Sequence, residues 1–167
     1  MIIGIGGVSR AGKTTLAYKI RDLYPKQKIR FVHGDDVVKD VDNIPMIKDR
    51  IDWECIESFD YEKIINRIKS DDDSDIIICE GILIFHNKEL FKFFDKKIIA
   101  EIGKDCFYKR KSQDDRWGYE PEWYIDYIWE SYIRHYSKLN NNKDILKIKG
   151  ETSFDMEKIS KFLDFRT

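Results

Sequence analysis

The residues of this sequence with the clearest chemical pattern form a nine-residue stretch close to its start. The stretch matches the spacing G-x-x-x-x-G-K-[ST], in which glycines let successive backbone amides turn inward around a phosphate. A lysine at this spacing supplies positive charge to the β- and γ-phosphates, and the hydroxyl that follows can coordinate Mg²⁺. The pattern predicts a nucleoside triphosphate site, with Mg²⁺ as a second expected ligand. The residues expected to contact them are Gly7, Ser9, Arg10, Ala11, Gly12, Lys13, Thr14 and Thr15.

The flanking residues place this loop between a strand and a helix. The apolar run Ile2–Ile5 precedes it, and Leu16, Ile20 and Leu23 recur at helical spacing behind it. A helix that begins at Lys13 directs its unpaired amides and the positive end of its dipole toward the loop. This context favours a phosphate site over a chance match in an ordinary βα turn.

Three carboxylates accompany two further apolar runs. Asp35 and Asp36 come after Ile29–Val32, and Glu80 follows Asp75–Cys79. Ligands of open parallel sheets bind beyond the carboxyl ends of the strands, so we expect these acids at the rim of the phosphate site. One acid could hold Mg²⁺ or its waters while another orients an attacking hydroxyl and accepts its proton. A helix cap is the structural alternative for each acid taken alone.

Apolar runs alternate with helical patterns along the chain. This order predicts an α/β fold of the P-loop NTPase type: a doubly wound, five-stranded parallel sheet with helices on both faces. One domain over residues 1–167 is expected. The expected strands are Ile2–Ile5, Ile29–Val32, Asp75–Cys79, Lys97–Ile102 and Ile145–Lys149. The expected helices are Lys13–Leu23, Trp53–Lys69, Lys88–Phe94, Lys104–Asp114, Glu122–Leu139 and Met156–Leu163.

The composition excludes several classes of partner. With 30 basic and 31 acidic residues, the net charge of −1 gives no basic field for nucleic acid. No apolar run has the length needed to span a membrane. The scattered cysteines Cys55, Cys79 and Cys106 indicate reduced thiols in a cytoplasmic protein. The expected partner is a small molecule, and the sequence leaves open a monomer or a homodimer.

Two other classes of P-loop protein fit less well. Asp115-Arg116-Trp117-Gly118 spells the GTPase pattern D-x-x-G, but in a charged helical region, and Asn142-Lys143-Asp144 has its aspartate one position early for N-K-x-D. Nucleoside monophosphate kinases need arginines to hold the acceptor phosphate. Between Asp35 and Glu80 the chain has only Arg50 and Arg67. An uncharged or cationic acceptor suits this stretch better.

Four further segments follow the phosphate loop: Asp35-Asp36, Trp53–Asp60, Ile76–Phe85 and the basic-then-aromatic stretch Tyr108–Tyr132. With the loop, they resemble nicotinamide riboside kinase and, less closely, the wider uridine kinase group, over essentially the whole chain. The resemblance implies an ATP-dependent kinase, a phosphotransferase that acts on the 5′-hydroxyl of a riboside. Nicotinamide riboside, converted to nicotinamide mononucleotide in NAD biosynthesis, is the favoured substrate. Uridine or another nucleoside is the alternative.

The resemblance also implies a short lid segment at about 109–120 and roles for single residues. Asp35, with Lys13 and Glu80, would form the catalytic set, and Asp35 would accept the proton of the 5′-hydroxyl. Thr14, Asp35 and Glu80 would lie at the metal. Trp53 would stack on the base and Glu54 would bind the ribose 2′- and 3′-hydroxyls. The other residues assigned to substrate or ATP are Asp36, Arg110, Lys111, Arg116, Thr152, Ser153 and Phe154.

Trp53 also has a substrate argument of its own. A flat π-face beside the Glu54 carboxylate suits a pyridinium, which gains about 0.5–2 kcal/mol of cation–π attraction that a neutral base lacks. The structural alternative is a core tryptophan packed on Phe59. Tyr119, in the aromatic stretch, is a possible second stacking face.

Several positions depart from the family pattern. Glu54 stands where the family usually has aspartate, Lys111 replaces an arginine, and Val37-Val38 replaces an aromatic pair. The lid carries Gln113-Asp114-Asp115 where basic residues are expected. These departures leave a second hypothesis open: a nucleotide-binding regulatory module that has lost its catalysis.

Overall fold

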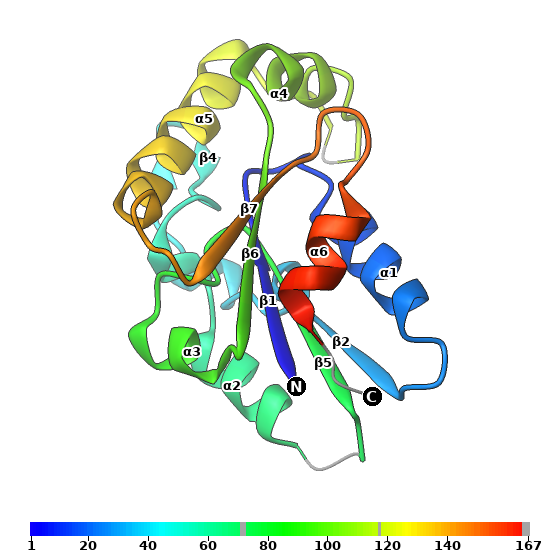
Figure 1. Ribbon diagram of the computed structural model, residues 1–167. Helices are drawn as coiled ribbons and strands as arrows, with labels where there is room; N and C mark the ends of the chain where they lie inside the picture. Colours follow the sequence, from blue (N-terminus) through cyan, green and yellow to red (C-terminus); the bar gives the residue numbers. More distant parts are fainter. Residues whose placement is uncertain (71–72, 117, 165–167) are drawn as a thin grey trace.

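The computed structural model describes residues 1–70, 73–116 and 118–164 (Figure 1). Trp117, which belongs to the expected lid and to the D-x-x-G pattern, lies outside the described residues. Five strands form one parallel sheet in the order β2-β5-β1-β6-β7. The predicted doubly wound α/β fold is thereby confirmed. The strands are β1 Ile2–Gly6, β2 Ile29–His33, β5 Ile76–Glu80, β6 Lys96–Glu101 and β7 Ile145–Lys149.

Helices cover both faces of the sheet, with α1 and α6 on one face and α2, α3 and α5 on the other (Figure 1). The central strands are buried on both sides, so they are apolar along nearly their whole length. No helix in the described part of the chain is both long and apolar enough to cross a membrane. The helices are α1 Lys13–Leu23, α2 Tyr61–Lys69, α3 Lys88–Phe93, α4 Lys104–Lys111, α5 Glu122–Tyr136 and α6 Met156–Leu163.

The segment between β2 and α2 differs from the prediction. The expected helix from Trp53 is wrong in its first part, because α2 begins at Tyr61, where the Asp60 carboxylate accepts the backbone N–H of Lys63 at 2.9 Å. Before it, the Ser58 hydroxyl contacts the backbone carbonyls of Trp53 and Cys55, an arrangement that competes with helical hydrogen bonding. The sequence analysis also missed a hairpin of two short antiparallel strands, β3 Met46–Ile47 and β4 Arg50–Ile51. Short 3₁₀ turns occupy Gly34–Asp36, Val41–Asn43, Ile56–Ser58 and Ser137–Leu139.

Candidate active site

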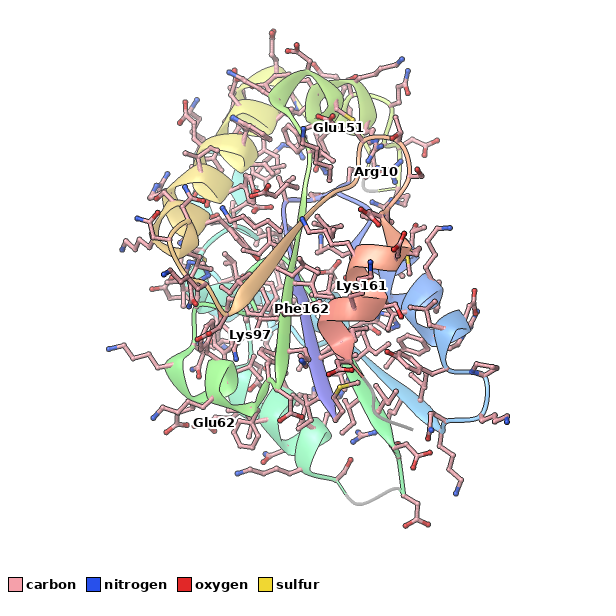
Figure 2. All side chains as sticks on the ribbon, viewed as in Figure 1. Arg10, Glu62, Lys97, Glu151, Lys161 and Phe162 are labelled. Carbon is pink, nitrogen blue, oxygen red and sulfur yellow. The ribbon has the colours of Figure 1, made fainter. Side chains whose placement is uncertain are left out.

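A cavity of about 430 Å³ lies beyond the carboxyl ends of β1, β2 and β5. The phosphate loop, the acids, the lid and the loop after β7 all contribute to it. Figure 2 shows Arg10 and Glu151, from two of these segments, at the end of the sheet away from the chain termini. Most of the predicted site residues are therefore brought together. The cavity is lined by Ser9, Arg10, Gly12, Lys13, Thr14, Thr15, Asp35, Glu80, Ile82, Arg110, Arg116, Gly150, Thr152 and Phe154.

A second cavity, of about 440 Å³, lies between α5 and the loop after β7. Trp129, Tyr132 and Ile133 form much of its wall, and Glu101 and Lys149 lie at its edge. It contains no residue of the phosphate loop and neither of the acids Asp35 and Glu80. Size alone does not distinguish the two cavities, whereas the phosphate loop together with Asp35 and Glu80 identifies the first as the candidate site.

The backbone of the phosphate loop depends on its two glycines. Gly7 has φ 147° and Gly12 has φ 88°, values that side chains rarely adopt. A Cβ at Gly7 would also lie 2.4 Å from the carbonyl oxygen of Ala100. The Gly7 amide donates to the Tyr136 hydroxyl at 2.9 Å, and that hydroxyl donates to the carbonyl of Ile82 at 2.7 Å. Gly7 thus shapes the loop, while the part that faces the cavity runs from Ser9 onward.

Lys13 is the buried cation of the loop. Its ammonium donates to the backbone carbonyl of Val8 at 3.1 Å, within the turn itself. Ala11 is fully buried beneath the turn, and its amide also donates to the carbonyl of Val8. The first turn of α1 begins at Lys13, so the ammonium and the helix N-terminus act on the same small volume.

Glu80 contacts polar side chains beside this turn. Its Oε1 accepts the Thr14 hydroxyl at 3.1 Å and lies 2.8 Å from Nδ1 of His33. The side chain is only 4% exposed, and its Oε2 is buried with no hydrogen-bond partner among the described residues. The sequence analysis did not assign His33, although the parallel register pairs it directly with Glu80. That pairing is the signal that could have found it.

The arrangement around Glu80 fits a magnesium site completed by phosphate. Mg²⁺ is usually held by one or two carboxylates together with substrate phosphates and water, not by an all-protein cage. Consistent with this, residues 1–70, 73–116 and 118–164 form no group of three His, Cys, Asp or Glu side chains suited to a metal. The partnerless Oε2 of Glu80 and the neighbouring Thr14 hydroxyl supply oxygen donors of the required kind.

Asp35 reaches the cavity from the turn after β2. Part of its surface is exposed there, yet the surrounding protein removes enough water to raise the pKa of its carboxyl. Lys13 opposes this shift, whereas the negative charges of Glu80 and Asp36 add to it. A carboxylate with a raised pKa is a better proton acceptor. Asp36 itself is exposed and does not line the cavity.

Glu54 and Trp53 lie outside the cavity lining. Glu54 is only 7% exposed, and burial raises the pKa of its carboxyl to about 8. Lys13 and Lys111 act against this shift, and Asp35 adds to it, so Glu54 lies within electrostatic reach of Lys13 and Asp35. Trp53 is half-buried and is not among the described side chains packed on the core. This placement agrees with a stacking role better than with the core alternative.

The raised pKa of Glu54 predicts a pH-dependent stability. Between its ordinary value of 4.5 and about 8, the folded chain keeps a proton that the unfolded chain releases, so the free energy of unfolding should fall as pH rises through this window. Urea titrations at about pH 5 and about pH 8 measure the decline. We expect a smaller decline in Glu54→Gln, and an unchanged one in Glu57→Gln, which alters an exposed acid on the same segment. An equal decline in all three proteins would contradict the assignment.

The segment predicted to be the lid begins at the end of α4, where Arg110 joins two loops. Its guanidinium donates to the carbonyls of Arg10 at 3.1 Å, Gly150 at 2.9 Å and Glu151 at 2.8 Å. Arg110 thus braces the phosphate loop against the loop after β7. Of the residues predicted to touch adenine, Thr152 and Phe154 line the cavity, whereas Ser153 is exposed and lies outside the lining.

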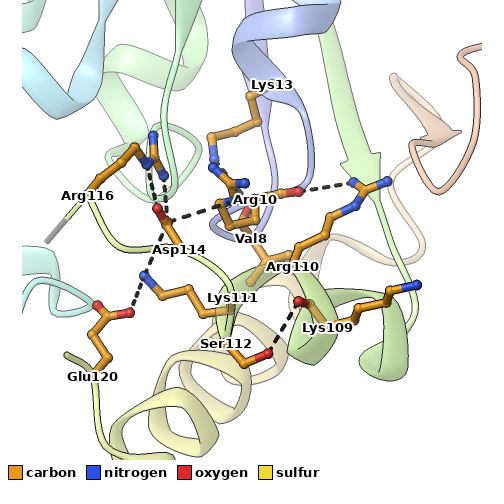
Figure 3. Close-up of polar contacts among 10 residues, drawn as sticks. All are labelled: Val8, Arg10, Lys13, Lys109, Arg110, Lys111, Ser112, Asp114, Arg116 and Glu120. Atoms are coloured by element: carbon orange, nitrogen blue, oxygen red, sulfur yellow. Dashed lines mark hydrogen bonds and ion pairs between the residues drawn. The ribbon is translucent and has the colours of Figure 1, made fainter. Parts of the chain in front are cut away.

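Like Asp36, Trp53 and Glu54, the predicted substrate contacts Lys111 and Tyr119 do not line this cavity. Lys111 is buried and its ammonium lies 2.7 Å from the Glu120 carboxylate, so the chain itself satisfies its charge. Tyr119 is 83% exposed, and its carbonyl accepts a hydrogen bond from Arg50. Arg116 does line the cavity, and its guanidinium pairs with Asp114 (Figure 3). The sequence analysis treated Asp114 only as a loss of basic charge.

The fold and the phosphate loop define the class: this is the fold of the P-loop kinases. A possible uridine kinase from Bacillus stearothermophilus matches with a TM-score of 0.58 at 18% identity, over 87% of this chain and 88% of that one. A shikimate kinase from Aquifex aeolicus matches with a TM-score of 0.53 at 20% identity, over 98% and 93%. No family model matches the sequence.

Among individual proteins, the chain is similar to nicotinamide riboside kinases. It is 25% identical to nicotinamide riboside kinase 1 of Rattus norvegicus, over 91% of this chain and 87% of that protein. It is 23% identical to the nicotinamide riboside kinase of Saccharomyces cerevisiae, over 87% and 81%. A uridine kinase of Chlamydia pneumoniae is 29% identical over 63% and 59%. The resemblance predicted from the sequence is confirmed.

Proposed function

We propose that this chain is an ATP-dependent kinase that phosphorylates the 5′-hydroxyl of a riboside, with nicotinamide riboside as the favoured substrate. The observation that carries the proposal is the convergence of Lys13, Asp35 and Glu80 on one cavity at the carboxyl ends of the strands. The similarity to nicotinamide riboside kinases and to a uridine kinase supports the same reaction class.

The residues of the cavity have different roles in phosphoryl transfer. Asp35 aims the hydroxyl at the γ-phosphorus and accepts its proton, for which a raised pKa is suited. The Lys13 ammonium and the Arg116 guanidinium offset the charge on the transferring group. Thr14 and Glu80 would hold Mg²⁺, which when bound supplies charge neutralisation at the β- and γ-oxygens. Positioning and electrostatics therefore account for most of the rate.

The acceptor side supports a riboside with a cationic base. Trp53 offers an aromatic face that is not committed to the described core and that could stack on a cationic base, and the acids Asp35 and Asp52 act electrostatically on the neighbouring Glu54. At neutral pH the Glu54 carboxyl retains its proton, so it can both donate to and accept from a vicinal diol. A neutral pyrimidine gains less from this environment.

A panel of ribosides tests the proposal. The purified protein is incubated with ATP, Mg²⁺ and nicotinamide riboside, uridine, cytidine or adenosine, and ADP is measured. We expect ADP with nicotinamide riboside above the other ribosides. Faster turnover of uridine would contradict the substrate choice. ATP binding without ADP from any riboside would contradict the kinase and favour a nucleotide-binding regulatory module.

A further inference from the structure

The lid contains one buried carboxylate that contacts three cations (Figure 3). The Asp114 side chain is 1% exposed, and its two oxygens accept from Nε and Nη2 of Arg116, each at 2.7 Å. Its Oδ2 also lies 3.8 Å from Nε of Arg10 and 3.9 Å from Nζ of Lys111. The hydrogen bonds from Arg116 lower the pKa of Asp114 to about 2, with Arg10 and Lys111 adding to the effect against the opposing influence of burial. Asp114 is therefore charged at every physiological pH.

The geometry at Arg116 fixes the plane of its guanidinium. Asp114 engages Nε and Nη2 in a two-bond contact that sets both position and orientation, while Nη1 takes part in neither bond. The Arg116 side chain remains 56% exposed and lines the phosphate cavity. The arginine is thus held from one edge, with its charge still open to the cavity.

The same carboxylate connects the lid to the phosphate loop. Arg10 belongs to that loop, lines the cavity, and has φ 63°, a conformation that few side chains adopt. Lys111 completes the group from the end of α4, and Glu120 balances its charge at 2.7 Å. The three cations and two carboxylates leave a net charge of about +1. The cluster therefore remains attractive to an anion.

We propose that Asp114 is a positioning residue that holds Arg116 of the lid and Arg10 of the phosphate loop in place for the γ-phosphate of a nucleoside triphosphate. The inference rests on the proposed function only in its choice of ligand. A carboxylate this deeply buried cannot separate from its cationic partners without leaving an unpaired charge inside the protein. Asp114 therefore orients the arginines and does not compete with phosphate for them. The acidic lid residue is, on this account, part of the anion site and not a defect in it.

The test is a double-mutant cycle that measures nucleotide affinity, and it needs no phosphoryl acceptor. Calorimetric titrations with Mg²⁺ and AMP-PNP compare the wild-type chain with Asp114→Asn, Arg116→Ala and the double variant. We expect Asp114→Asn to weaken binding about tenfold, with a smaller effect on ADP, which lacks the γ-phosphate. Because Asp114 acts mainly through Arg116, the double variant should bind little more weakly than Arg116→Ala alone. Fully additive losses, or unchanged or tighter binding by Asp114→Asn, would overturn the proposal.

Two further variants separate positioning from folding. Asp114→Glu keeps the carboxylate on a longer side chain and should recover most of the lost affinity, even if Asp114→Asn folds poorly; no recovery would count against the proposal. Asp115→Asn removes the same charge from the neighbouring exposed residue and should bind AMP-PNP like the wild-type chain. If Asp115→Asn weakened AMP-PNP binding as much as Asp114→Asn does, the effect would come from net charge and not from positioning.

The outcome is distinguishable from that of the kinase proposal. A wild-type chain that binds AMP-PNP but produces no ADP with any riboside would contradict the kinase while leaving the binding cycle fully interpretable. A chain that turns over ribosides but shows no coupling between Asp114 and Arg116 would contradict only the positioning role. Failure of the wild-type chain to bind Mg²⁺ and AMP-PNP would overturn both.

Discussion

Replacing Asp35 with asparagine is expected to lower kcat by about 10²–10⁴-fold, the usual contribution of a positioned acid or base. Asparagine has nearly the same shape but cannot accept the proton of the acceptor hydroxyl. The KM for ATP should change much less, because the phosphate loop is left intact. Steady-state ADP production with saturating riboside measures both constants.

The pH dependence of the rate adds a second readout to this variant. The pKa of Asp35 is raised, so wild-type turnover should fall as pH decreases and the carboxyl takes up a proton. Asp35→Asn should lose this limb of the profile. Asp40→Asn, which changes an exposed acid on the loop after β2, is the matched control and should behave like the wild-type chain. Near-wild-type turnover by Asp35→Asn would remove Asp35 from the mechanism.

Replacing Lys13 with methionine is expected to lower kcat by about 10²–10³-fold, as for the loss of one preorganised group that stabilises transition-state charge. Methionine fills a similar volume without the ammonium, and ATP affinity should fall as well. Removal of this charge should also raise the pKa of Asp35 and of Glu54 further, because Lys13 now lowers both. Kinetics and the pH profile of the rate check these effects together.

The control for this variant lies on the same helix. Lys19 is exposed on α1, so Lys19→Met removes the same charge and leaves the cavity unchanged. It should keep wild-type rates. A Lys13→Met variant that kept wild-type turnover and ATP affinity would show that the loop does not bind the triphosphate as inferred.

The sequence was sufficient for the centre of the sheet because the central strands are buried on both faces. Runs such as Ile76–Glu80 are nearly continuous in apolar residues, and this pattern needs no long-range information. The segment from Trp53 to Asp60 could not be predicted in the same way. Its apolar residues permit a helix, but the hydrogen bonds of the Ser58 hydroxyl to Trp53 and Cys55 decide the local conformation.

Residues of the candidate site could be predicted only where a motif or the end of a strand fixes their positions. Lys13 and Thr14 are fixed by the loop spacing, and Asp35 and Glu80 by their places at strand ends. The contact of His33 with Glu80 required the strand register, which composition does not contain. The role of Asp114 required knowing that Arg10, about a hundred residues earlier in the chain, lies beside it.

A crystal structure with Mg²⁺, AMP-PNP and nicotinamide riboside tests the central claim most directly. The account predicts the γ-phosphate against the Lys13 ammonium, and the riboside 5′-oxygen within hydrogen-bond distance of the Asp35 carboxylate and in line with the γ-phosphorus. It also predicts an oxygen of Glu80 directed to the metal or to one of its waters. A riboside bound with its 5′-hydroxyl away from Asp35, or a triphosphate bound outside the phosphate loop, would contradict it.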